Sequence, residues 1–200
     1  MNNLSVPIPC KEEVEKYLNL WNSLPDYVAQ ESALDKLFFG DFKYNDNLEN
    51  ILIKCSVLND FYSTNIFKIY SVATHILSLN IDERLVNGDP TLVDDIAKVT
   101  ISGKNKYFYS FASKYCSHHN PTAYPIYDSY VEKVLKHFRK LKPNFNFHND
   151  DLKQYDKFKN ILIDFQKLYG IEEYNLKDLD RYLWQLGKEK FPIDYNKKIK

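Results

Sequence analysis

The chain has 200 residues, which is enough for one domain with a buried core. It carries 27 basic and 27 acidic side chains, and a net charge of zero excludes a strongly basic nucleic-acid-binding protein. No apolar run approaches the ~18 residues that a membrane span requires. The N-terminus also lacks the basic and apolar regions of a signal peptide. We therefore expect a cytoplasmic protein with no membrane partner.

Apolar residues recur at helical spacing along almost the whole chain. Val14, Leu18 and Trp21 mark the first such segment, and Pro25 is well placed to begin the second. Helices are predicted over residues 11–24, 25–39, 48–60, 65–79, 82–88, 90–99, 106–118, 129–141, 151–169 and 176–187. No segment predicts a strand convincingly. The expected fold class is all-α, with residues 1–200 forming a single helical domain.

The cysteine and histidine residues do not predict a metal site. Cys10, Cys55 and Cys116 are odd in number and lack the spacing of metal ligands, as expected for reduced thiols in the cytoplasm. His118 and His119 are adjacent, and neighbouring histidines rarely share one ion without further ligands. We expect neither a metal nor a cofactor.

Positive charge is concentrated in the middle of the chain. Residues 89–142 carry nine basic and five acidic side chains, whereas residues 1–88 carry seven and twelve. Residues 143–200 carry eleven and ten. A modest basic patch suits contact with a phosphate backbone, although a solvated charged helix face would give the same count.

The most informative acid in the sequence is Asp128, which follows Pro125-Ile126-Tyr127 at the start of a predicted helix. A carboxylate in this position can cap the helix by accepting a bond from its first free N–H groups. Alternatively, it can lie in a pocket and stabilise a developing positive charge. The choice between the two roles decides whether the protein is an enzyme.

Two segments resemble motifs of the helix-hairpin-helix DNA glycosylases, and in particular their 8-oxoguanine glycosylase branch. The segment Ser63-Thr64-Asn65-Ile66-Phe67-Lys68-Ile69 is similar to the asparagine-rich turn that this family inserts into the DNA stack. The segment Ile101-Ser102-Gly103-Lys104-Asn105-Lys106, followed by a helix and Asp128, is similar to the hairpin and catalytic aspartate. The resemblance covers about residues 45–140, with helices of residues 1–44 and 150–190 expected to pack on this core.

The resemblance implies a role for each matched residue. Double-stranded DNA is the expected partner, and an extruded base leaves a space that a short polar side chain can fill. Asp128 would stabilise the charge that develops on the sugar when the base departs. The remaining assignments are Ser63, Thr64 and Asn65 for filling the stack, Gly103, Lys104 and Asn105 for binding a phosphate, and Tyr107 and Tyr127 for the base pocket.

The sequence departs from the family pattern at two positions. Asn105 occupies the place of the second hairpin glycine, and asparagine tolerates the left-handed conformation better than most residues. With Gly103 aligned to the first glycine, Tyr107 occupies the place of the nucleophilic lysine of bifunctional members. A turn shorter by one residue would put Lys106 there, whereas Lys104 and Lys114 remain further candidates. Without such a lysine, water would attack the sugar.

The resemblance therefore implies a DNA glycosylase that removes a damaged or modified purine through Asp128, with additional lyase activity if Lys106 acts as the nucleophile. Some relatives carry an iron–sulfur cluster, which requires four cysteines near the C-terminus, and this chain lacks them. The alternative is a non-catalytic module that keeps the glycosylase fold and binds DNA or another protein.

Overall fold

The computed structural model describes residues 5–192, which form a mostly helical protein with one small β-hairpin. Among the described residues, no helix is long and apolar enough to cross a membrane. In chain order, the elements are α1 (Lys11–Asn22), α2 (Pro25–Asp35), the π-helical turn η1 (Lys36–Asp41), α3 (Leu48–Phe61), α4 (Ile69–Ser78), α5 (Asp82–Asn87), α6 (Thr91–Ala97), β1 (Lys98–Ile101), β2 (Lys104–Tyr107), α7 (Tyr109–His119), α8 (Ser129–Leu141), the 3-10 helix η2 (Asn149–Lys153), α9 (Tyr155–Tyr169) and α10 (Leu176–Lys190).

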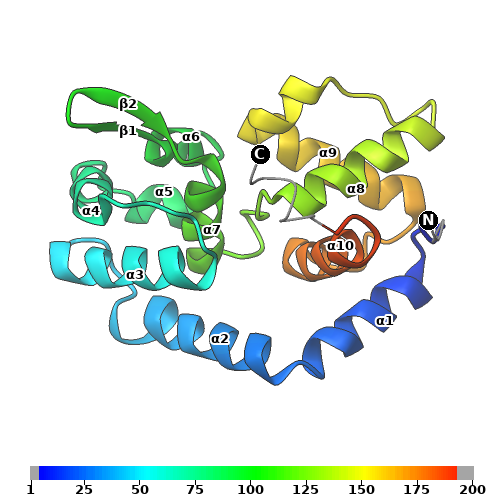
Figure 1. Ribbon diagram of the computed structural model, residues 1–200, viewed down its shortest axis with the longest axis horizontal. Coiled ribbons are helices and arrows are strands. Elements are labelled where there is room, and N and C mark those ends of the chain that lie inside the picture. Colours follow the sequence, from blue (N-terminus) through cyan, green and yellow to red (C-terminus); the bar gives the residue numbers. More distant parts are fainter. Residues whose placement is uncertain (1–4, 193–200) are drawn as a thin grey trace, which may run out of the picture.

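The helices form two groups that lie side by side (Figure 1). One group consists of α3 to α7 with the hairpin, and the other consists of α8, α9 and α10 with α1. Helix α2 follows α1 and leads through η1 to the first group, while the connection from α7 to α8 joins the groups a second time (Figure 1). Helices α6 and α9 also touch across the boundary.

The interior is rich in aromatic rings, which supply large apolar areas and pack edge to face or tilted. In the second group, the Phe138 ring of α8 lies 5.6 Å from the Phe165 ring of α9. In the first group, the Phe38 ring of η1 lies 5.6 Å from the Tyr115 ring of α7. All four rings are buried. The high aromatic content therefore serves mainly to build the core of each group.

The sequence predicts a helix that begins at Lys106 and no strands, and both predictions are wrong at residues 98–107. Residues 98–107 form an antiparallel hairpin in which Lys98 pairs with Tyr107 and Ile101 with Lys104. Ser102 and Gly103 make the turn, with φ values of 50° and 73°. Asn105 does not have a positive φ but pairs with Thr100. The turn implied by the resemblance is therefore a β-hairpin between α6 and α7.

Other predicted helix boundaries also differ from the structure. Helix α4 begins at Ile69 rather than Asn65, because Asn65 has a φ of 57° and lies in the connection that precedes the helix. Helix α10 continues through Gly187 to Lys190, although glycine commonly ends a helix. The predicted helix over 151–169 is divided at Gln154 into η2 and α9.

Gly187 lies where α10 crosses α8 at close range. A Cβ atom at this position would lie 2.7 Å from Cβ of Tyr130 and 2.8 Å from its carbonyl oxygen. Both distances are shorter than a van der Waals contact, and part of the obstruction is backbone. Glycine is therefore required by the contact between two helices and not by a turn.

Replacing Gly187 with alanine should lower the free energy of unfolding by about 1–3 kcal/mol, which is typical of overpacking in a well-packed core. Helix propensity alone would change stability in the opposite direction, by roughly 1 kcal/mol in favour of alanine. The sign of the change in urea unfolding therefore separates the two effects. A stabilised Gly187→Ala variant would contradict the close contact between α8 and α10.

Candidate functional site

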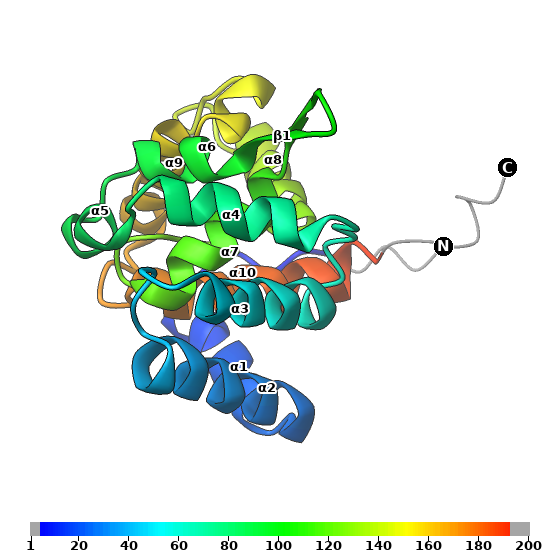
Figure 2. The ribbon, with the colours of Figure 1, turned by 90° about the vertical axis from the view of Figure 1, so that its left-hand side faces the viewer.

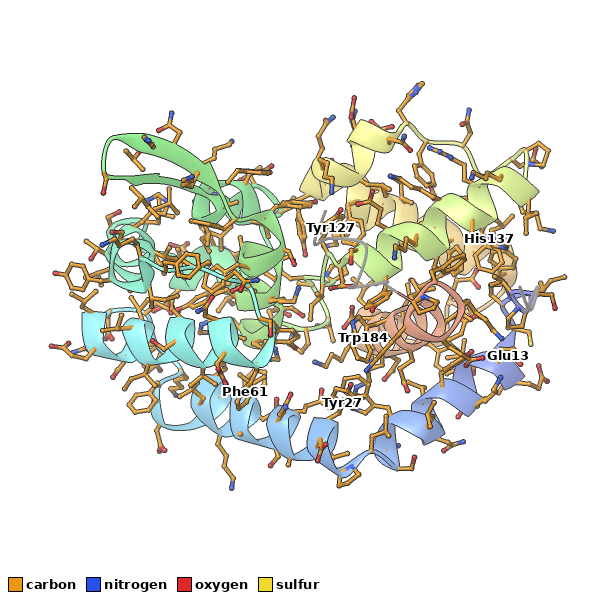
Figure 3. All side chains as sticks on the ribbon, viewed as in Figure 1. Glu13, Tyr27, Phe61, Tyr127, His137 and Trp184 are labelled. Atoms are coloured by element: carbon orange, nitrogen blue, oxygen red, sulfur yellow. The ribbon has the colours of Figure 1, made fainter. Side chains whose placement is uncertain are left out.

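A cleft opens where the two groups of helices meet, and it is the main candidate for a functional site. Residues from α1, α2, the end of α3, α7, the α7–α8 connection and α10 line it. Figure 3 shows Tyr27 and Trp184 facing one another between α2 and α10, with Phe61 further along α3. The lining residues are Trp21, Tyr27, Gln30, Glu31, Leu34, Phe61, Tyr62, Lys114, His118, Ile126, Asp128, Lys177, Asp180, Arg181 and Trp184.

One wall of the cleft is a cluster of three aromatic rings. The Trp21 ring stacks on the Tyr27 ring at a centroid distance of 5.2 Å. The Trp184 ring meets both rings edge-on, at 6.0 Å from Trp21 and 5.4 Å from Tyr27. Because the three residues come from α1, α2 and α10, the wall forms only in the folded protein. Such a wall offers flat apolar surface to a planar ligand.

An ion-pair network of other cleft residues supports this wall. Glu31 contacts Lys177 at 3.0 Å and Arg181 at 2.7 Å, and it accepts a hydrogen bond from the Trp21 indole N–H at 3.1 Å. Burial raises the pKa of Glu31, but Lys177 and Arg181 outweigh this effect and hold the pKa at about 2. Glu31 is therefore ionised at neutral pH and fixes the Trp21 ring.

Lys114 lies on α7 at the inner side of the cleft and is only 3% exposed. Its Nζ atom donates to Oγ of Ser110 at 2.5 Å and lies 3.5 Å from the Tyr127 carbonyl oxygen. It also lies 5.1 Å from the centre of the Tyr62 ring. Burial lowers the pKa of Lys114, although the charge of Asp128 acts in the opposite direction. A larger fraction of Lys114 than of an exposed lysine is therefore neutral, and the neutral amine is the nucleophilic form of lysine.

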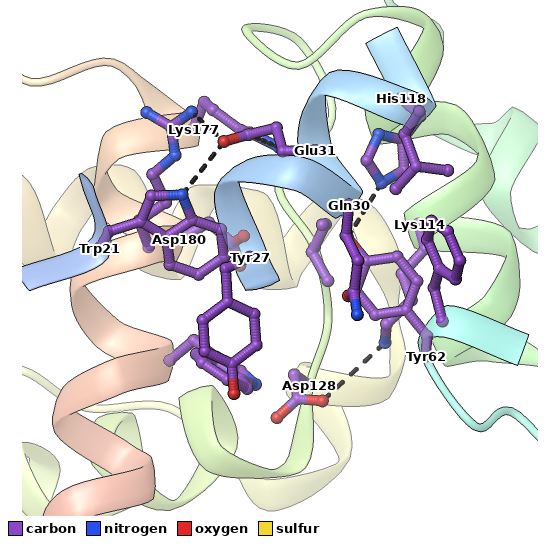
Figure 4. A pocket seen from close by; sticks show the side chains of 15 residues that line it. Trp21, Tyr27, Gln30, Glu31, Tyr62, Lys114, His118, Asp128, Lys177 and Asp180 are labelled. Atoms are coloured by element: carbon purple, nitrogen blue, oxygen red, sulfur yellow. Dashed lines mark hydrogen bonds and ion pairs between the residues drawn. The ribbon is translucent and has the colours of Figure 1, made fainter. Parts of the chain in front are cut away.

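Asp128 caps α8 and also lies in the cleft beside a buried lysine. Its Oδ1 atom accepts a hydrogen bond from the Tyr130 N–H at 2.8 Å and caps α8. Its Oδ2 atom lies 3.8 Å from Nζ of Lys114 (Figure 4). The carboxylate is held at the N-terminus of a helix, where negative charge is favoured. The cap therefore positions the acid beside the buried lysine.

His118 and Tyr62 close the inner end of the cleft opposite Trp21 and Tyr27 (Figure 4). The Tyr62 hydroxyl lies 2.9 Å from Nε2 of His118 and is placed to donate to it. Burial, followed by the charges of Lys177 and Lys114, lowers the pKa of His118 to about 3. The imidazole is therefore neutral at physiological pH and can accept the tyrosine proton.

Asp180 brings a second carboxyl group to the cleft. Its Oδ1 atom is buried and has no hydrogen-bond partner within residues 5–192. Burial raises the pKa of Asp180 to about 7, with Lys177 acting in the opposite direction. A buried polar atom without a partner costs free energy, so a ligand that donates a hydrogen bond here would relieve this cost.

Of the residues that the sequence predicts for the site, the structure brings Asp128 and the further lysine candidate Lys114 into the cleft. Lys106 lies on the exposed strand β2, where it pairs with Val99. Tyr107 lies on the same strand and donates to Asp94, while Tyr127 is buried against Tyr109 and Phe158. The other predicted residues lie on exposed connections: Ser63, Thr64 and Asn65 between α3 and α4, and Gly103, Lys104 and Asn105 at or beside the hairpin turn.

Most residues of the cleft were not predicted from the sequence. Lys114 is an exception, because it was a further candidate for the nucleophile on the basis of its place in the helix. In the sequence, Lys114 follows Ser110 by one helical turn. Asp128 comes later, in a loop that a proline introduces. The aromatic wall gives no such signal, because Trp21, Tyr27 and Trp184 are far apart in the chain.

Within the described part of the chain, no group of three or more His, Cys, Asp and Glu side chains is placed to hold a metal ion. His119 instead lies 3.3 Å from Nζ of the buried Lys54 and from Nδ2 of Asn45. The cleft itself presents a buried amine, a carboxylate and a flat aromatic wall.

Comparison with known proteins places the chain in a family. Residues 13–123 match the HI_0787_N family model, which is described as an N-terminal domain. A protein of Haemophilus influenzae (strain ATCC 51907 / DSM 11121 / KW20 / Rd), described as an uncharacterized protein, is 51% identical over 174 residues. These residues cover 86% of this chain and 79% of that protein. No solved structure matches the chain significantly. The chain belongs to the HI_0787_N family.

The buried histidine makes stability depend on pH. The folded pKa of His118 is about 3, whereas an unfolded histidine titrates near pH 6.5, so the unfolded chain binds the proton more readily between these values. The neutral imidazole therefore contributes its full stabilisation of the folded state above about pH 6.5. The free energy of unfolding should be about 2 kcal/mol lower at pH 5. His118→Gln should reduce this loss in urea unfolding measured at pH 5 and pH 8. The exposed His148→Gln variant is the control and should keep the wild-type dependence; equal pH dependence in all three proteins would contradict the buried neutral imidazole.

Proposed function

We propose that the protein is a DNA glycosylase that removes a damaged or modified purine-type base, with Lys114 as the nucleophile and Asp128 as the electrostatic partner. The observation that supports this proposal most directly is the buried amine of Lys114. This amine lies 3.8 Å from the carboxylate of Asp128 in an aromatic-lined cleft. This proposal keeps the predicted aspartate. It replaces Lys106 with Lys114, because Lys106 lies outside the cleft.

The position of Lys114 suits an attack on a sugar. In the proposed step, a bond forms between Nζ and C1′ as the bond between C1′ and the base nitrogen breaks. The base leaves with the bonding electron pair and takes up a proton. The C1′–O4′ bond then breaks, O4′ takes its electron pair and the proton lost from Nζ, and a protonated Schiff base between Nζ and C1′ remains. The buried environment supports this chemistry because it raises the neutral fraction of the amine.

Asp128 suits the other half of the reaction. Positive charge develops on the sugar as the base departs, and a fixed carboxylate stabilises that charge without reorganisation. The hydrogen bond from the Tyr130 N–H fixes one carboxylate oxygen and leaves Oδ2 directed towards Lys114. The same acid therefore faces the place where the proposed nucleophile meets the sugar.

The aromatic wall suits an extruded base. An enzyme that acts on a base in duplex DNA must turn the nucleotide out of the stack and hold it against aromatic or apolar side chains. Tyr27 and Trp184 offer such surfaces, and Asp180 offers a buried carboxyl oxygen to a base N–H group. The cleft therefore joins a flat binding surface to the amine and the carboxylate.

Borohydride trapping tests the nucleophile directly. Incubation with duplexes that carry 8-oxoguanine or other modified purines should give a covalent protein–DNA adduct, because borohydride reduces the Schiff base. Lys114→Gln should abolish the adduct, and the matched Lys106→Gln control on exposed β2 should retain it. Asp128→Asn should reduce base release by at least about a hundredfold, the size expected when one electrostatic contact to the transition state is lost.

Three results would contradict the proposal. An adduct that persists in Lys114→Gln would exclude this lysine as the nucleophile. An unchanged rate of base release in Asp128→Asn would exclude the electrostatic role. No release from any lesion by the wild-type protein would favour the alternative of a non-catalytic module that binds DNA or another protein.

The pH dependence of trapping on preformed abasic DNA tests the coupling between the two groups. The rate should rise with pH through a midpoint below the ordinary lysine value of 10.5, because burial lowers the pKa of Lys114 and the neutral amine reacts. Asp128→Asn removes a charge that raises this pKa, so the midpoint should move further down. Asparagine is also a good helix cap and should preserve the start of α8. A midpoint that stays in place or rises would show that the two groups are not coupled.

A further inference from the structure

Tyr62 lies at the inner end of the cleft and has no role in the reaction proposed above. It immediately follows α3, which packs against α7 (Figure 2). Its ring lies over Nζ of Lys114, with 5.1 Å between the nitrogen atom and the ring centre (Figure 4). A cation within about 6 Å of an aromatic ring centre is attracted by the electron-rich face of the ring. Tyr62 therefore contacts the atom that the proposed reaction uses as its nucleophile.

His118 holds the Tyr62 ring in this place. The Tyr62 hydroxyl lies 2.9 Å from Nε2 of His118, and the centres of the two rings are 5.8 Å apart. His118 follows Lys114 by one turn of α7, so both side chains lie on the same face of that helix. Because burial lowers the pKa of His118 to about 3, its imidazole is neutral and accepts the hydrogen bond at neutral pH. This bond therefore fixes the ring beside the Lys114 amine.

Tyr62 remains a neutral phenol in this position. Burial raises the pKa of Tyr62, and the negative charges of Asp180 and Glu31 raise it further. The attraction between Tyr62 and Lys114 therefore comes from the face of the ring and not from a negatively charged oxygen. A phenylalanine ring would supply the same attraction, whereas a leucine side chain would not.

The hydrogen-bond acceptors around Lys114 suit the free ammonium group. Nζ donates to Oγ of Ser110 at 2.5 Å, and it lies 3.5 Å from the Tyr127 carbonyl oxygen and 3.8 Å from Oδ2 of Asp128. An ammonium group has three N–H donors, whereas the nitrogen of a protonated Schiff base keeps only one. Formation of the Schiff base therefore removes hydrogen bonds that stabilised the charge. The attraction to the Tyr62 ring depends on the charge and not on the number of N–H groups, so it persists.

From these observations we infer that Tyr62 is a catalytic residue whose ring face stabilises the positive charge on Nζ of Lys114, first on the ammonium group and then on the protonated Schiff base. The inference rests on the proposed function for the sugar that forms this Schiff base. The stabilisation of the charged amine is a property of the folded protein, and it can be measured without DNA. The ring itself forms and breaks no covalent bond.

Other ionisable groups of the cleft also act on Lys114. Asp128 and Asp180 oppose the effect of burial and raise the pKa of Lys114. A change of Tyr62 leaves these carboxyl groups in place, so a shift in the titration of Lys114 reports the loss of the ring. The remaining titratable or charged side chains that line the cleft are Tyr27 and Glu31 on α2, His118 on α7, and Lys177 and Arg181 on α10.

Reductive methylation measures the titration of Lys114 without DNA. Formaldehyde forms a Schiff base with the neutral amine, cyanoborohydride reduces it, and mass spectrometry of the digested protein gives the rate at Lys114 for each pH. Tyr62→Leu should move the midpoint down by roughly 0.5–1.5 pH units, the range expected for loss of one cation–π contact. A smaller side chain that admitted water would instead raise the midpoint, because weaker burial favours the charged amine. The direction of the change therefore separates the ring face from the bulk of the ring.

Two further variants make the test specific. Tyr62→Phe keeps the ring and removes only the hydroxyl group, so its midpoint should stay close to the wild-type value. Tyr70→Leu is the matched control, because Tyr70 lies on α4 outside the cleft and is 64% exposed. This variant should titrate like the wild-type protein. Thermal unfolding of each variant verifies that the fold is intact.

Trapping on preformed abasic DNA tests the stabilisation of the Schiff base itself. After correction for the fraction of neutral amine, Tyr62→Leu should give about 2- to 30-fold less borohydride adduct than the wild-type protein, which is the same cation–π range expressed as a ratio. Tyr62→Phe and Tyr70→Leu should give nearly the wild-type yield.

The outcomes separate this inference from the proposed function. An unchanged or raised midpoint in Tyr62→Leu would overturn the inference, and so would an unchanged corrected yield of adduct. A midpoint that falls equally in Tyr62→Phe would also overturn it, because the hydroxyl group and not the ring would then be responsible. If the midpoint falls only in Tyr62→Leu but the wild-type protein forms no adduct with DNA, the stabilisation of the charged amine by the ring stands and the proposed catalytic activity fails.

Discussion

The burial of Lys114 is the constraint on which the arrangement of the cleft depends. A charged amine that is removed from water must be compensated by hydrogen bonds and an opposite charge, or else lose its proton. Ser110, the Tyr127 carbonyl oxygen and Asp128 provide these contacts. All three groups lie on α7 or on the connection to α8. The contacts that the buried Lys114 needs therefore fix the residue at which α8 begins.

The cleft follows from the way in which the two groups of helices are joined. Helix α7 belongs to the first group and carries Lys114, whereas α8 and α10 belong to the second group. The close contact at Gly187 holds α10 against α8, and α10 in turn carries Trp184 and Asp180 into the cleft. Helices α1 and α2 complete the aromatic wall with Trp21 and Tyr27. The site therefore combines residues from both ends of the described chain with residues from its middle.

Hydrophobic periodicity was sufficient to predict the helical class and most of the helices. The structure confirms a mostly helical protein, and α3 and α8 begin at the predicted residues. The hairpin could not be predicted in this way, because its strands have four residues each and Lys104–Tyr107 carries no apolar alternation. From the sequence, Gly187 predicts the end of a helix, because a sequence cannot show that a neighbouring helix excludes a side chain.

The candidate site was predictable only where local sequence determines it. Asp128 was found because the proline-apolar step and the helix start are local features. From the sequence, the assignment of Lys106 depends on the length of the turn after Gly103, and it fails because Lys106 lies on the exposed strand β2. Asp180 and the aromatic wall depend on packing between distant segments, which periodicity does not reveal.

The most direct measurement is to locate the covalent bond between protein and DNA. The borohydride-reduced complex with a lesion-containing duplex is digested, and mass spectrometry identifies the modified peptide. A sugar adduct on Lys114 is the expected result, since this amine is buried in the cleft beside Asp128. An adduct on Lys106 or another exposed lysine, or the absence of any adduct despite base release, would contradict the assignment of Lys114 as the nucleophile.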